Sequence, residues 1–110
     1  MLDVSPGRTY NSEVKGASLS GLWVILVDEE GRKTPMLARA GNGLYLLAFR
    51  TGFTARKFVT EKGLSDAEPR LLVASNLPEL LATLESKQIA GVLIDYDATS
   101  NTYKEAGLVY

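Results

Sequence analysis

The chain has 110 residues and a formal net charge of -1, with 45% hydrophobic and 23% charged residues, as expected for one soluble globular domain. It contains no cysteine and no histidine, which excludes disulfides, zinc-thiolate sites and a Ser-His-Asp relay within the chain. The balanced charge does not indicate nucleic acid as a partner, and no apolar run approaches the roughly 20 residues that cross a bilayer. The first ten residues lack the features of a secretory signal, so we expect a bacterial cytoplasmic domain without a cofactor.

The N-terminal segment and three strands come first in chain order. Residues 1–20 show neither a helical nor a strand period, so we expect a flexible or loosely docked arm before a single domain over residues 21–110. Apolar and β-branched residues, separated by turns at 28–31 and 41–43, then predict a meander. The third strand is apolar on both faces, which predicts a central position. The predicted strands cover residues 22–27, 34–40 and 44–50.

A helix is predicted after the third strand. Thr54 is a suitable N-cap, and Phe53 and Phe58 then occupy the two positions of a hydrophobic staple. Ala55, Phe58 and Val59 recur on one face, which predicts that this face is buried. The pair Lys62-Gly63 supplies a cation and a glycine suited to the helix end.

A second helix is predicted from Asn76, which precedes Glu79 at the spacing of a capping box, with Pro78 in the first turn. Its core face comprises Leu77, Leu80, Leu81 and Leu84.

The complete order of predicted elements is β-β-β-α-β-α-β, with the last two strands at 71–74 and 90–97. A meander followed by strand–helix alternation predicts an α/β fold on the border with α+β. We expect one mixed sheet of about five strands with the helices packed on it. The tail after residue 97 begins with turn residues and ends in Leu108, Val109 and Tyr110, so it either returns to the domain or reaches a partner.

A strand, a glycine-containing turn and a basic helix follow one another in LLAFRTGFTARKFVTEKG, residues 46–63. Helix N-termini present N–H groups and the positive end of the helix dipole, which is the general geometry of an anion site. A cap, a turn glycine and a solvated basic face explain the same residues without a ligand, and neither phosphate-binding fingerprint is present. The candidate anion or partner surface comprises Arg50, Thr51, Gly52, Thr54, Arg56 and Lys57.

Carboxylates form the second candidate site. Asp95 and Asp97 end one predicted strand on a common face, and residues 28–30 end another. Parallel neighbouring strands would bring these oxygens together for a hard cation or for carboxylate catalysis. Strand-end turns explain them equally, and no calcium-loop spacing is present, so we expect neither a metal site nor catalytic residues.

The aromatic residues do not point to a particular function. Trp23 and Tyr45 lie within apolar strands, where core filling is expected. Three tyrosines near the C-terminus have polar neighbours, and they belong either to an interface or to strand-edge packing. They are Tyr96, Tyr103 and Tyr110.

Residues 21–96 resemble the N-terminal domain of the SseB family. The resemblance rests on the strand that ends in an acidic-glycine turn, the third strand running into Phe53-Thr54, the leucine-rich helix and the strand GVLID. Ala55 stands where the family has a serine. The resemblance implies a bacterial α/β domain of accessory or interaction proteins, with no established enzymatic activity and no catalytic residues to transfer.

These observations lead to three functional expectations. The first is a non-enzymatic protein-interaction or regulatory module, which binds a partner protein or a second copy of the chain and uses neither nucleic acid nor membrane. The second is a domain that binds a small anion at residues 50–57. The third is an enzyme that uses carboxylates.

Overall fold

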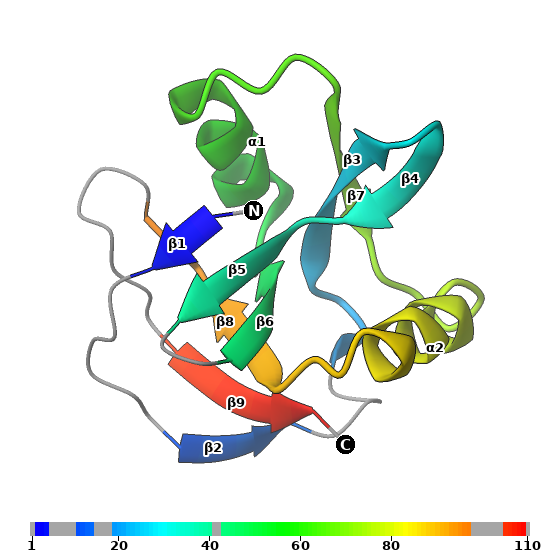
Figure 1. The fold of residues 1–110 in the computed structure, drawn as a ribbon. Helices are drawn as coiled ribbons and strands as arrows, with labels where there is room; N and C mark the ends of the chain where they lie inside the picture. Colours follow the sequence, from blue (N-terminus) through cyan, green and yellow to red (C-terminus); the bar gives the residue numbers. More distant parts are fainter. Residues whose placement is uncertain (1, 5–10, 15–18, 41–42, 98–104, 110) are drawn as a thin grey trace.

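The structure, a computed structural model, describes residues 2–4, 11–14, 19–40, 43–97 and 105–109. These residues form two helices and nine strands (Figure 1). The strands are β1 Leu2–Val4, β2 Asn11–Val14, β3 Trp23–Glu29, β4 Arg32–Pro35, β5 Leu37–Ala40, β6 Gly43–Ala48, β7 Ala67–Leu71, β8 Gly91–Ile94 and β9 Glu105–Val109, and the helices are α1 Gly52–Glu61 and α2 Leu77–Ser86.

The strands form two sheets. An antiparallel three-stranded sheet has the order β4-β3-β7, and a mixed six-stranded sheet has the order β1-β5-β6-β8-β9-β2. The expected class, α/β on the border with α+β in a single domain, is confirmed. The expectation of one sheet of about five strands is wrong, because the described strands divide between two sheets.

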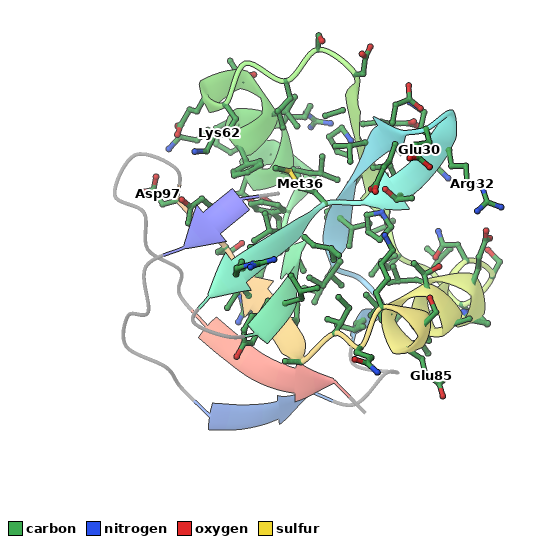
Figure 2. All side chains as sticks on the ribbon, viewed as in Figure 1. Glu30, Arg32, Met36, Lys62, Glu85 and Asp97 are labelled. Carbon is green, nitrogen blue, oxygen red and sulfur yellow. The ribbon has the colours of Figure 1, made fainter. Side chains whose placement is uncertain are left out.

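The division of the sheets lies inside the second predicted strand. Residues 32–35 pair with β3, whereas residues 37–40 pair with β6. Met36 joins the two sheets, since its N–H donates to the carbonyl of Ile25 and its own carbonyl accepts from Leu47 N–H (Figure 2). A continuous run of strand-forming residues gives no sign of a change of partner, because pairing is a property of the neighbouring strands.

The fourth predicted strand is displaced. We expected it at the apolar run 71–74, but β7 covers Ala67–Leu71 and pairs with β3. β7 lies at the edge of its sheet, where Pro69 is tolerated because an edge strand need not donate from every residue.

Both ends of the chain contribute strands. β1 and β2 lie within residues 1–20, where the sequence shows no strand period, and Leu19 is fully buried in the core. The C-terminal tail returns to the domain, because β9 pairs with β8 and with β2. Tyr103 and Tyr110, from the predicted tyrosine group, lie outside the described residues.

The two helices cover opposite faces of the central strands. β6 confirms its predicted central position, because Leu46 packs in the cluster under α2 while Leu47 packs in the cluster under α1. β3 alternates in the same way, with Val24 on the α2 side and Ile25 on the α1 side. This alternation is the period of two expected for a strand buried on both faces. No helix in the described part of the chain is long and apolar enough to cross a membrane.

Candidate functional site

The predicted surface lies at the carboxyl ends of β6 and β8. These strands are parallel neighbours, with Ala48 opposite Ile94, so the residues that follow each strand emerge at the same edge of the sheet. Arg50 follows β6 and Asp95 follows β8. The topology therefore brings together the basic turn and one carboxylate pair, which were predicted as two separate candidate sites.

Asp95 binds Arg50 through both of its oxygens. Oδ1 accepts a hydrogen bond from the Arg50 backbone N–H at 3.0 Å, and Oδ2 lies 3.4 Å from Arg50 Nε. The Asp95 backbone has a φ of 58°, a left-handed conformation that aspartate adopts more readily than most residues. The Asp95 side chain is only 10% exposed. This carboxylate therefore neutralises the cation nearest to the start of α1.

The N-terminus of α1 is capped by Thr51, not by Thr54 as predicted. Thr51 Oγ1 accepts from Thr54 N–H at 3.1 Å, and Thr54 Oγ1 donates to the Thr51 carbonyl at 3.0 Å. The Thr51 carbonyl also accepts from Ala55 N–H. The predicted staple is consequently wrong, because the earlier cap moves Phe53 from the position before the helix into its first turn. Both threonines precede possible first turns, and sequence alone does not separate them.

Gly52 is explained by packing. A Cβ atom placed on Gly52 would lie 3.1 Å from Cζ2 of Trp23, which is partly buried. Trp23 is held there by two backbone hydrogen bonds with Phe49. Gly52 therefore lets the indole ring approach the first turn of the helix.

The outer face of α1 carries an exposed aromatic residue between cations. Phe53 is 72% exposed, although it was predicted to help staple the helix. Arg56 and Lys57 follow at i+3 and i+4, which places all three residues on one face. Lys57 Nζ lies 3.7 Å from Glu61 Oε1. We call Phe53, Arg56 and Lys57 the α1 outer face.

The predicted buried and closing residues of α1 are confirmed. Phe58 is only 2% exposed and Ala55 is fully buried, while Val59 is partly buried against the same cluster. Lys62 is the C-cap, and Gly63 follows with a φ of 63°, as a glycine after a helix end does.

A hollow of about 150 Å³ lies beside the same helix, between α1 and the residues after β8. Its polar lining joins two predicted groups, because Thr54 and Lys57 face Asp95 and Asp97, with Glu61 also present. Among the described residues that line it, there are three carboxylates and one cation. This lining does not favour an anion inside the hollow.

Tyr96 closes the inner side of this hollow. Its ring packs edge-on against Phe58 at a centroid distance of 5.7 Å, and Phe58 contacts Phe49 at 5.4 Å. Burial raises the pKa of the Tyr96 hydroxyl above its ordinary value, and the negative charge of Asp97 adds to the effect. Tyr96 is therefore a core residue, as strand packing predicted, and not an exposed interface tyrosine.

The other predicted carboxylates lie elsewhere. Asp28 is on β3, whose neighbours are β4 and β7, so it does not lie next to the end of β8. Figure 2 shows Glu30 and Asp97 on opposite sides of the molecule. Within the part of the chain that the structure describes, no group of three acidic residues is arranged to hold a metal ion.

Comparisons with known proteins add nothing to this geometry, since no family model, curated protein or solved structure matches the chain. The resemblance of residues 21–96 to the SseB family therefore stays a prediction.

Proposed function

We propose that this chain is a non-enzymatic protein-interaction or regulatory module of the bacterial cytoplasm, which binds an acidic partner protein through the α1 outer face. The observation that carries the proposal is the 72% exposure of Phe53. Large exposed aromatic residues and arginines are the side chains that most often dominate binding energy in protein interfaces. Here both types stand one turn apart on a helix whose opposite face is fixed in the core.

The charges around Phe53 support an acidic partner. Arg56 makes no salt bridge among the described residues, and Lys57 has only an exposed pair with Glu61. An exposed pair of this kind contributes about 0–1 kcal/mol, so a partner carboxylate can replace Glu61 at low cost. The positive face would increase the rate of encounter with a negatively charged surface.

The test uses the full chain as bait in an extract of the cells that produce it, followed by affinity measurement with the captured partner. We expect Phe53→Asp to weaken binding by roughly thirtyfold or more, which corresponds to about 2 kcal/mol for an aromatic anchor. The double variant Arg56→Glu/Lys57→Glu should weaken it by about tenfold.

The matched control is Lys62→Glu/Lys87→Glu, which changes the net charge equally but lies outside the α1 outer face. It should bind like the wild type. Unfolding midpoints of all variants show whether each one is folded. Full binding by Phe53→Asp and by the Arg56→Glu/Lys57→Glu variant would refute the proposal.

The alternative of a small-anion site at residues 50–57 has weaker support. Arg50 is paired with Asp95, and the N–H of Thr54 already donates to Thr51. If this alternative is correct, millimolar phosphate will raise the melting temperature in a saturable manner, and Arg50→Gln will reduce that rise.

An enzyme that uses carboxylates is the second alternative, and it also has weaker support. Asp95 is engaged with Arg50, and Asp28 belongs to another sheet.

A further inference from the structure

Among the strands that the structure describes, the three-stranded sheet ends in β4 on one side and in β7 on the other. An edge strand directs every second backbone N–H and C=O away from its neighbour, and these groups can pair with a further strand. β4 and β7 each contain one proline, Pro35 and Pro69. Proline has no N–H, so its effect on an edge depends on whether its backbone faces the neighbouring strand or the outside.

The hydrogen bonds between β3 and β7 place the Pro69 backbone on the outside. The Leu72 N–H donates to the Leu22 carbonyl at 2.8 Å, so the Leu72 backbone faces β3. Backbone direction alternates along a strand, and the register of this pair is continuous. Residues 67, 69 and 71 therefore face outward, and Pro69 is the middle one of the three.

The last outward residue of β7 is engaged from within the chain. Asn76 Nδ2, at the start of α2, donates to the Leu71 carbonyl at 2.9 Å. Glu68 and Arg70 form an exposed ion pair at 3.1 Å on the same strand, and charged side chains on an edge strand also oppose pairing. The β7 edge therefore lacks an N–H at its middle, and the carbonyl at its end already accepts a hydrogen bond.

The β4 edge has a similar arrangement. The Met36 N–H donates to the Ile25 carbonyl at 2.7 Å, so this N–H is directed to β3. By the same alternation the Thr34 backbone faces β3, whereas those of Lys33 and Pro35 face outward. Two of the four prolines in the chain therefore occupy outward positions on the two edges of one small sheet.

We propose that Pro35 and Pro69 keep the three-stranded sheet from adding a strand of a second copy of this chain. An incoming strand would find no donor where each proline stands, and one of its own carbonyls would lose its partner. The inference does not depend on the proposed function, because neither proline belongs to the α1 outer face.

The test is sedimentation of the full chain over a concentration series that reaches the millimolar range. Pro69→Val supplies an outward N–H and a β-branched side chain, so it should self-associate about tenfold more tightly than the wild type or better. Pairing of β7 with β7 of a second copy is a closed contact, so dimers are expected. Pro35→Val should dimerise through β4. The double variant Pro35→Val/Pro69→Val has two open edges and should form species larger than a dimer.

Two controls match these changes. Pro78→Ala removes a proline from the first turn of α2, where no sheet edge gains an N–H. Thr34→Val introduces a valine into β4 at a residue whose backbone faces β3. Both should sediment like the wild type. Pro69→Ala is a second variant of the β7 edge, which supplies the N–H without a β-branched side chain and should also associate more tightly than the wild type.

Amide hydrogen exchange locates the new contact. In Pro69→Val, the amide of residue 69 should become protected as the protein concentration rises, because it then donates to a second copy. Unfolding midpoints show whether each variant is folded. Association without protection at residue 69 overturns the inference, and so do valine variants that associate no more tightly than the wild type.

Discussion

The two faces of the three-stranded sheet are closed to different extents. On the α1 side, Phe58 and Phe49 are at most 2% exposed and continue into Tyr96, which gives a contiguous aromatic cluster. On the α2 side, leucines cover only part of the sheet. A groove of about 250 Å³ stays open between α2 and the rest of that face. The same strand, β3, contributes alternate residues to both sides.

The two sides differ because the side chains under the two helices differ in volume. Three aromatic rings fill the space under a ten-residue helix, whereas leucines of an equally long helix do not reach the end of the sheet. Burial on the α1 side stabilises the domain and holds the outer face of that helix in place. On the α2 side, the groove has both apolar and charged lining residues, among them Leu26, Lys33 and Glu79.

The largest expected effect on stability is in the aromatic cluster on the α1 side. Phe58→Ala should lower the free energy of unfolding by about 3–5 kcal/mol, because it removes a buried ring and leaves a cavity between Phe49 and Tyr96. Urea unfolding measures the change. Phe58→Leu is the control and should cost clearly less. A loss below about 1 kcal/mol for Phe58→Ala would show that the cluster is not tightly packed.

A smaller effect is expected beside the groove. Leu80→Ala should cost about 2 kcal/mol, the low end for a buried leucine, because Leu80 borders existing open space. Leu84, on the same helix face but less exposed, should cost more when it is changed to alanine. Urea unfolding measures both changes. Equal losses of unfolding free energy at the two positions would contradict the expectation that Leu84 is more tightly packed than Leu80.

Asn76, at the start of α2, accepts a hydrogen bond from Val73 N–H and donates one to the Leu71 carbonyl, at 2.9 Å each. Loss of these two bonds should have a smaller effect on stability. Asn76→Ala should cost about 1–2 kcal/mol, because it leaves Val73 N–H and the Leu71 carbonyl without this partner. Asn76→Asp keeps the acceptor for Val73 and loses only the donor, so about half the cost is expected. Thermal and urea unfolding measure both. No loss in Asn76→Ala would mean that the start of α2 is held by packing alone.

The smallest expected effect is the dependence of stability on pH through Tyr96, on the α1 side. The pKa of Tyr96 is raised in the folded state, so its contribution to stability is fully present below the ordinary pKa of 10.0 and is lost as pH rises through the folded value. Urea midpoints of the wild type should therefore fall more steeply above pH 10 than those of Tyr96→Phe. Parallel curves for the two proteins between neutral and alkaline pH would exclude this linkage.

The candidate site was only partly predictable. Six residues around the start of α1 were predicted as a candidate surface, because threonine, glycine and basic residues at a strand–helix junction have known roles. Phe53 was predicted to form a hydrophobic staple with Phe58, and it is 72% exposed because Thr51, not Thr54, caps the helix. The pairing of Arg50 with Asp95 joins residues far apart in sequence, so no local pattern indicates it.

The fold was also only partly predictable from the sequence. Periodicity determined the buried faces of both helices and the central position of β6, because those patterns express burial of neighbouring residues along one element. Tertiary structure alone decided the change of sheet at Met36, the position of β7 and the open groove beside α2. Each of these depends on which strand or helix lies alongside, and a residue's own propensity carries little information about a neighbour that is distant in sequence.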